Sequence, residues 1–230
     1  MSAGNEGMSV YAASEAGQAA GATFRNELLT EVTDTLTWSG VDYGVYSGSH
    51  AALLAGHRPV KDIDIWFDYA KIDDVHNVFP EATMTDRRQS GENVTGDYDG
   101  ALFSFGDAAG IELMTGTFTR AEGVKYPLCW DNELLKRLEL REYSGVRAHF
   151  VNPVDTLLFK AISQRPPEEG KHDLADIAAI AGAVAIDKAY LFWRTTKSLA
   201  WGRVMPLLIK MDIVTIDDIN EYRASGQYGT

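Results

Sequence analysis

The chain has 230 residues, 45% of them hydrophobic and 23% charged, a composition typical of a soluble globular protein. Its 33 acidic and 21 basic residues give a net charge of −12, which argues against extensive DNA binding, because sequence-independent binding relies on neutralising phosphates. The single cysteine, Cys129, excludes an internal disulfide framework and fits a reducing, cytoplasmic location. Residues 1–21 lack the features of a secretory signal and no apolar run approaches the length of a membrane span, so we expect no membrane association.

The first predicted elements surround a turn rich in small residues. Residues 1–21 are rich in Ala, Gly and Ser, and we interpret them as a mobile tail. Apolar residues at helical spacing predict a helix over residues 23–38. A short strand, Tyr43–Tyr46, then leads into a Gly-Ser turn, and residues 49–55 are expected to form a helix that ends at Gly56.

Residues 62–67 begin with two acids that alternate with two isoleucines and end with Trp66 and Phe67, and we predict a strand over this range. Because successive side chains of a strand point to opposite faces, Asp62 and Asp64 share one face and the isoleucines share the other. A helix is expected over residues 71–79. Residues 85–100 are polar and rich in glycine, and we interpret them as a loop or hairpin beside the acidic strand.

Three further strands and one helix are predicted before residue 152. The strands cover residues 101–105, 111–114 and 148–151, and the helix covers residues 130–138.

From Pro153 onward the pattern is helical, with Asn152 suited to cap the first of these helices. The predicted helices cover residues 153–164, 171–183, 188–200 and 204–211. We therefore predict an α+β fold, with a mixed β-sheet flanked by helices and followed by a C-terminal helical region. The corresponding domains are an α/β domain at residues 22–151 and a helical domain at residues 152–230.

The Gly-Ser turn and the acidic strand are complementary parts of a candidate site. Two carboxylates on one strand face lie about 6–7 Å apart at their Cα atoms and suit one or two hard cations. Gly48 and Ser49 open a short helix whose free N–H groups suit a phosphate. Taken alone, Asp62 and Asp64 are equally well explained as the solvated face of an edge strand.

Glu112 is a candidate third acid. It lies on the predicted strand at residues 111–114, on the face opposite to Ile111 and Leu113. If this strand neighbours the acidic strand, Glu112 joins Asp62 and Asp64, and a divalent cation would relieve the repulsion among three carboxylates. The alternative is a glutamate that faces solvent on an amphipathic strand.

The run of Gly48-Ser49, Asp62-Ile63-Asp64 and the later Glu112 resembles the nucleotidyltransferase superfamily that shares the palm of DNA polymerase β. Residues 153–160 and 171–177 are similar to the helical region of stand-alone bacterial nucleotidyltransferases of the antibiotic-modifying and abortive-infection toxin types. The resemblance covers residues 23–183. It implies a nucleotidyltransferase fold and transfer of a nucleoside monophosphate from an NTP to an acceptor hydroxyl, with release of pyrophosphate.

The resemblance also implies roles for individual residues. Asp62, Asp64 and Glu112 would bind two Mg²⁺ ions, and Glu112 is a candidate base for the acceptor hydroxyl. Gly48 would let the backbone approach the phosphates, and Ser49 would donate its hydroxyl and N–H to them.

Three cationic side chains are candidates for nucleotide binding. Lys160 lies at the border of the apolar face of its helix, so it either reaches the phosphates or snorkels with a buried stem. Lys171 lies at a helix start, where a cation needs an anionic partner, and that partner is either the nucleotide or an aspartate such as Asp173 or Asp155. Arg58 flanks the acids and either binds a phosphate or balances local charge.

The acceptor stays open between a small molecule such as an aminoglycoside or lincosamide, the 3′ end of a tRNA, and a protein. The acidic net charge favours a cationic small molecule. Two alternatives to the enzyme remain: a catalytically silent nucleotide-binding module, and a toxin that is paired with an antitoxin.

Overall fold

The computed structural model describes residues 26–60, 62–86, 98–105, 110–143 and 146–226. The predicted mobile tail at residues 1–21 lies outside these residues, and so does most of the loop predicted over residues 85–100.

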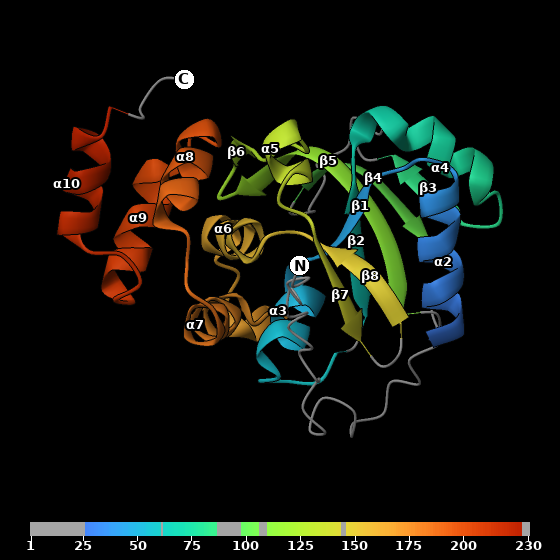
Figure 1. The fold of residues 1–230 in the computed structure, drawn as a ribbon, viewed down its shortest axis with the longest axis horizontal. Coiled ribbons are helices and arrows are strands. Elements are labelled where there is room, and N and C mark those ends of the chain that lie inside the picture. The colour runs from blue at the N-terminus through green and yellow to red at the C-terminus, as the bar shows by residue number, and fades with distance from the viewer. Residues whose placement is uncertain (1–25, 61, 87–97, 106–109, 144–145, 227–230) are drawn as a thin grey trace, which may run out of the picture.

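One mixed sheet forms the centre of the described fold (Figure 1). The sheet has eight strands. Seven of them follow the spatial order β3-β4-β5-β2-β1-β8-β7, and the eighth, β6, pairs only with β5. The pairs β1–β8 and β2–β5 are parallel, and the other pairs are antiparallel. The strands are β1 Tyr43–Tyr46, β2 Ile63–Phe67, β3 Thr83–Asp86, β4 Tyr98–Ser104, β5 Ile111–Ala121, β6 Val124–Pro127, β7 Glu139–Tyr143 and β8 Val146–Phe150.

Helices cover both faces of this sheet. Figure 1 shows α2 and α4 against one face and the group α6 to α10 on the other side. The α-helices are α2 Asn26–Trp38, α3 Ser47–Ala55, α4 Ile72–Val78, α5 Asn132–Leu135, α6 Pro153–Ser163, α7 Asp173–Ala183, α8 Lys188–Lys197, α9 Trp201–Lys210 and α10 Ile216–Ala224, with 3₁₀ turns at Tyr69–Lys71 and Pro167–Glu169. The predicted α+β fold, a mixed sheet flanked by helices with helices at the C-terminal end, is confirmed.

The alternation predicted for the acidic strand sets the two faces of β2. Ile63, Ile65 and Phe67 are each 0% exposed and belong to the core that α2 and α4 cover. Asp64 and Trp66 point to the opposite face. A shift of the strand by one residue would turn Asp64 into the apolar core. Burial of the opposite face stabilises the observed register by roughly 1.5–3 kcal/mol for each large apolar side chain. This burial therefore fixes the face on which the acid lies.

The second core joins the sheet to the C-terminal helices. Tyr46 and Trp66 from the sheet belong to the same buried cluster as residues of α6 to α10. The ring centroids of Tyr46 and Phe159 lie 5.0 Å apart, and those of Trp66 and Trp130 lie 5.4 Å apart. Trp66 is therefore a core residue. Because this cluster crosses residue 152, the predicted division into two domains stays a prediction.

Several element boundaries differ from those predicted. The helix α3 begins at Ser47 rather than at residue 49, and β5 extends to Ala121 rather than ending at residue 114. The helix predicted over residues 130–138 is the short α5. The strands β3, β6 and β7 and the helix α10 were not predicted, because exposed edge strands and a strongly acidic helix lack a regular apolar pattern. None of the described helices combines the length and the apolar character that a membrane span requires.

Candidate active site

The Gly-Ser turn lies where β1 passes into α3. Tyr46 is extended, and Ser47 adopts a left-handed φ of 60° that is uncommon for a residue other than glycine. The Ser49 hydroxyl donates to the Tyr46 carbonyl at 2.7 Å and accepts from the Asp64 N–H at 3.2 Å. Ser49 thus joins the turn to β2 beside the acid. In this arrangement the hydroxyl proton is directed to Tyr46, and donation from Ser49 to a phosphate stays a prediction.

A side chain at Gly48 would have to displace the guanidinium of Arg58. A Cβ added there would lie 2.7 Å from Nη2 of Arg58, 3.6 Å from Nζ of Lys160 and 3.8 Å from Oδ2 of Asp176. The requirement for glycine therefore comes from close approach rather than from backbone conformation. The groups that approach are two cations and a carboxylate, so the turn lies next to concentrated charge.

Two of the three predicted acids lie on adjacent parallel strands. Asp64 of β2 is the register partner of Glu112 of β5, so the condition on which Glu112 would join the acidic strand is met. Both side chains are partly buried, whereas Asp62 lies exposed just before β2. Asp64 also pairs with Tyr46 of β1, which places it directly beside the turn.

Burial and the neighbouring acids both disfavour the charged form of Asp64. Burial, together with the charges of Asp62 and Glu112, raises the pKa of Asp64 to about 7, although Lys160 and a hydrogen bond with Ser47 act against this rise. A divalent cation at this point would replace mutual repulsion with attraction. In the part of the chain that the structure describes, no three or more His, Cys, Asp or Glu side chains are arranged as a metal site. The metal centre at Asp62, Asp64 and Glu112 stays a prediction.

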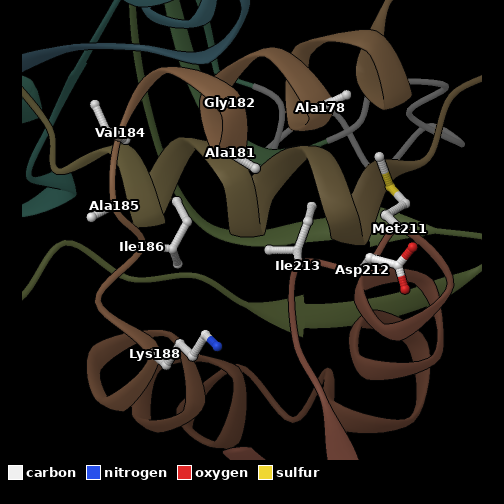
Figure 2. A pocket seen from close by; sticks show the side chains of 10 residues that line it. All are labelled: Ala178, Ala181, Gly182, Val184, Ala185, Ile186, Lys188, Met211, Asp212 and Ile213. Atoms are coloured by element: carbon white, nitrogen blue, oxygen red, sulfur yellow. The ribbon is translucent and has the colours of Figure 1, made fainter.

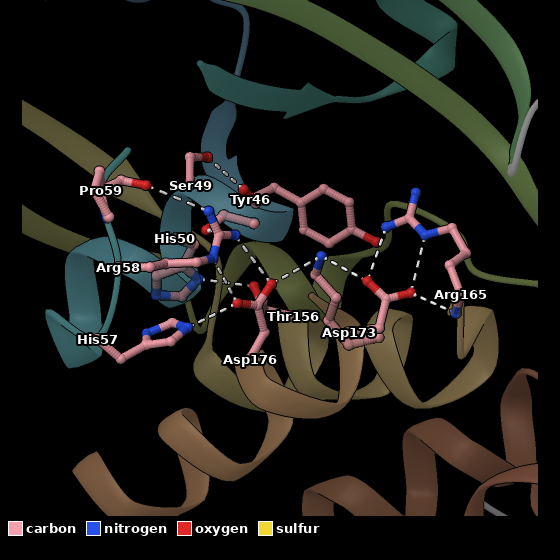
Figure 3. A network of polar contacts seen from close by, with 12 residues as sticks. Tyr46, Ser49, His50, His57, Arg58, Pro59, Thr156, Arg165, Asp173 and Asp176 are labelled. Atoms are coloured by element: carbon pink, nitrogen blue, oxygen red, sulfur yellow. Dashed lines mark hydrogen bonds and ion pairs between the residues drawn. The ribbon is translucent and has the colours of Figure 1, made fainter. Parts of the chain in front are cut away.

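On the other side of the turn, α6 and α7 supply a buried ion-pair network (Figure 3). Lys160 of α6 is 3% exposed, and its ammonium lies 2.9 Å from Asp173 and 3.0 Å from Asp176. Asp176 also accepts from His57 at 2.8 Å and from Arg58 at 2.9 and 3.1 Å. Lys160 therefore neither snorkels into solvent nor stands free, because both aspartates of α7 hold its ammonium.

The network continues from Asp173 to the loop after α6. Asp173 accepts from the Arg165 side chain at 2.9 and 3.0 Å and from its backbone N–H at 2.9 Å. Although burial acts to raise it, the hydrogen bonds from Arg165 and the charge of Lys160 lower the pKa of Asp173 below its ordinary value. Arg58, Lys160 and Arg165 together carry one more charge than the two aspartates of α7, so the network has a net positive charge beside the turn.

The predicted cations thus have different outcomes. Lys160 and Arg58 both lie against Gly48, as a role at the turn requires. Lys171 is exposed two residues before Asp173, whose ion-pair partners are Lys160 and Arg165. The sequence reasoning missed Asp176 and the part that Ser47 plays, although the spacing of Asp173 and Asp176 in the first turn of one helix was a signal that they share a face.

A separate cavity of about 420 Å³ lies in the helical region (Figure 2). It is lined mainly by small and aliphatic side chains from the end of α7, the segment before α8 and the segment after α9, with Lys188 and Asp212 as charged members. No candidate site residue lines it.

No protein-family model matches this chain, and no curated protein does. Among solved structures, the chain is similar to an antigenic nucleotidyltransferase-like protein from Paracoccidioides brasiliensis, with 15% identity over 86% of this chain and 90% of that one and a TM-score of 0.48. It is similar to the lincosamide antibiotic adenylyltransferase LnuA with lincomycin bound, with 16% identity over 70% and 99% of the two chains and a TM-score of 0.44. It is also similar to the antibiotic-resistance factor ANT(2'')-Ia, with 13% identity over 89% and 96% and a TM-score of 0.47.

Proposed function

We propose that this chain is a nucleotidyltransferase that transfers a nucleoside monophosphate from an NTP to an acceptor hydroxyl and releases pyrophosphate. The observation that supports the proposal most directly is the pairing of Asp64 with Glu112 beside the Gly48 turn. This arrangement combines carboxylates for a cation with backbone donors for a phosphate, which are the two requirements of metal-assisted phosphoryl chemistry.

The donor set fits Mg²⁺. Carboxylate oxygens are the ligands that this hard cation prefers, and Asp64 lies partly buried beside Glu112, where burial first and the charges of Asp62 and Glu112 second raise its pKa. Asp62, Asp64 and Glu112 would hold up to two ions. When bound, such ions would neutralise phosphate charge and lower the pKa of the acceptor hydroxyl. Glu112 is the proposed base that takes the hydroxyl proton.

The cationic side of the site would receive the phosphates. The free N–H groups at the start of α3 and the positive network of Arg58 and Lys160 lie together at Gly48. Lys171, exposed just before α7, is proposed as a further contact that a bound nucleotide would reach. The acceptor is proposed as a hydroxyl of a small molecule, a tRNA 3′ end or a protein, and the acidic net charge favours a cationic small molecule.

The proposal is tested by calorimetry with each of the four NTPs, with and without Mg²⁺, followed by pyrophosphate release with panels of drugs, tRNA and proteins as acceptors. We expect one NTP to bind only with Mg²⁺ and to yield pyrophosphate with one class of acceptor. Asp64→Asn and Glu112→Gln should abolish release, whereas Asp217→Asn, an exposed acid on α10, should retain it.

The other outcomes separate the alternatives. Binding without release across all acceptors would support a silent nucleotide-binding module. Growth arrest on expression that disappears in Asp64→Asn would support a toxin that an antitoxin restrains. Absence of Mg²⁺-dependent NTP binding would contradict the proposed function.

A further inference from the structure

We propose that Asp176 is a positioning residue for the Gly48 turn: it holds the Arg58 guanidinium, and Arg58 in turn holds the Gly48 carbonyl. Helix α7 of the C-terminal region would thereby set the shape of the turn at which the phosphates bind. This inference rests on the proposed nucleotidyltransferase function and adds to it a residue that does not itself touch the nucleotide.

The contacts form a continuous chain from α7 to the turn (Figure 3). Nε and Nη2 of Arg58 donate to the two carboxylate oxygens of Asp176 at 2.9 and 3.1 Å. Nη2 also donates to the Gly48 carbonyl at 3.0 Å. Two parallel hydrogen bonds fix both the position and the plane of a guanidinium, so the third bond reaches Gly48 from a fixed direction.

Burial makes this arrangement stiff. The Asp176 side chain is 0% exposed and that of Arg58 is 20% exposed. Burial by itself would raise the pKa of Asp176, but the hydrogen bonds from His57 and Arg58 and the charge of Lys160 hold this pKa well below its ordinary value. The carboxylate therefore stays ionised, and separating it from its cations would leave buried charges without partners.

The direction of the Gly48 carbonyl matters because it fixes a backbone donor. In a trans peptide the C=O and the next N–H point in opposite directions, so holding the Gly48 carbonyl toward Arg58 aims the Ser49 N–H away from it. The adjacent Ser47 is in the left-handed region, at a cost of roughly 1–3 kcal/mol, and persists only when its surroundings hold it. Gly48 is the second residue of α3, so the bond from Arg58 adds to the hold of the helix on this carbonyl, next to the strained Ser47.

The competing explanation is that Asp176 and Arg58 only stabilise the fold. The two explanations differ in what happens to phosphate binding when the pair is weakened in a protein that stays folded. They also differ in additivity, because two residues that act through one contact produce no larger effect together than either produces alone.

The experiment compares Arg58→Lys, Asp176→Asn and the double variant with Asp155→Asn as a matched control. Asp155 is also 0% exposed and ion-paired, with Arg194 at 2.7 Å and the Tyr190 hydroxyl at 3.0 Å, but these contacts lie within the helical region. The probes are the Mg²⁺ complex of the NTP that the wild type binds, inorganic tripolyphosphate, and the ¹⁵N-labelled Ser49 amide resonance without ligand. The thermal midpoint is measured for every variant.

We expect Arg58→Lys and Asp176→Asn each to raise the dissociation constant for both ligands by about tenfold and to shift the Ser49 amide resonance. The dissociation constant of the double variant should not exceed the larger of the two values measured for the single variants. Asp155→Asn should lower the thermal midpoint but leave the dissociation constant within about twofold of wild type.

Wild-type dissociation constants and an unmoved Ser49 resonance in both single variants would overturn the positioning role and leave the proposed function intact. A wild type that binds no NTP would overturn both. If Asp176→Asn does not fold, the dissociation constants and the Ser49 resonance of Arg58→Lys decide between the two explanations. Lysine keeps the positive charge but cannot form the two parallel hydrogen bonds.

Discussion

At the scale of single residues, Gly48 and Asp64 show how closely opposite charges are packed around one turn. Gly48 leaves the space that Arg58 and Lys160 fill, while Asp64 carries negative charge on the other side of the same turn. Both residues carry a cost in stability. Glycine has a low helix propensity, and burial removes part of the hydration of the Asp64 carboxylate.

Replacing Gly48 by alanine should separate function from stability. The added Cβ would lie 2.7 Å from the Arg58 guanidinium and displace it, so we expect Gly48→Ala to weaken Mg²⁺–NTP binding by about tenfold in calorimetry. Thermal stability should change little, because the gain of roughly 1 kcal/mol in helix propensity offsets part of the strain. Gly182→Ala in α7 is the control, since its Cβ would meet nothing within 4 Å. Equal affinity in the two variants would contradict this expectation.

Neutralising Asp64 should stabilise the protein when no divalent metal is present. Asp64→Asn would remove a partly buried charge that Asp62 and Glu112 repel, and relief of ~1 kcal/mol corresponds to a rise of about 2–4 °C in the melting temperature. The same variant should lose the further stabilisation that Mg²⁺ gives the wild type. Differential scanning calorimetry with and without Mg²⁺ checks both effects, and a lower melting temperature in EDTA would speak against the charge argument.

At the scale of elements, α3 is held between the sheet and α6 by polar as well as apolar contacts. His50 of α3 is 1% exposed, and its Nδ1 lies 2.8 Å from the Thr156 hydroxyl of α6. Burial, with a smaller effect from Arg141, lowers the pKa of His50 from 6.5 to about 3. His50 is therefore neutral in the folded protein at physiological pH.

This shift has a defined consequence for stability against pH. Because the folded pKa is below the unfolded one, the contribution of His50 is fully present above pH 6.5 and is lost as the pH falls from 6.5 toward about 3. We expect urea unfolding between pH 7 and pH 4 to show a fall in the free energy of unfolding that is smaller in His50→Asn. The matched control is His76→Asn, which replaces a histidine on the exposed face of α4. Identical slopes in all three proteins would refute the burial argument.

At the scale of the whole molecule, one apolar cluster links the sheet to the C-terminal helices. Tyr46 and Trp66 pack with residues of α6 to α10, and Trp66 touches Trp130. A core shared in this way would expose large apolar surface if either part unfolded alone.

The chain should therefore unfold as one cooperative unit despite the predicted boundary at residue 152. We expect the urea transitions followed by tryptophan fluorescence and by far-ultraviolet circular dichroism to coincide. We also expect the isolated segment of residues 152–230 to lack a cooperative transition. Two separated transitions in the full chain would instead support two independent domains.

The local pattern of the sequence was sufficient for the parts of the fold that depend on near neighbours. The alternation in β2 predicted the faces of Asp64 and Ile65, and Asn152 caps α6 by accepting from the Val154 N–H, as its sequence position indicated. The Gly-Ser turn was also evident, because only backbone conformation and small residues define it. The exposed edge strands β3, β6 and β7 were missed because they bury little apolar surface to set a pattern.

The sequence by itself determined which residue types could form a site, namely the Gly48 turn and the three acids, together with the α+β class. The tertiary structure alone decided their partners. It paired Asp64 with Glu112 across two strands, and it brought Asp176 to Arg58 from 118 positions along the chain. Local periodicity carries no information about such distant pairs, because the packing of α7 against α3 and α6 selects which buried charges meet.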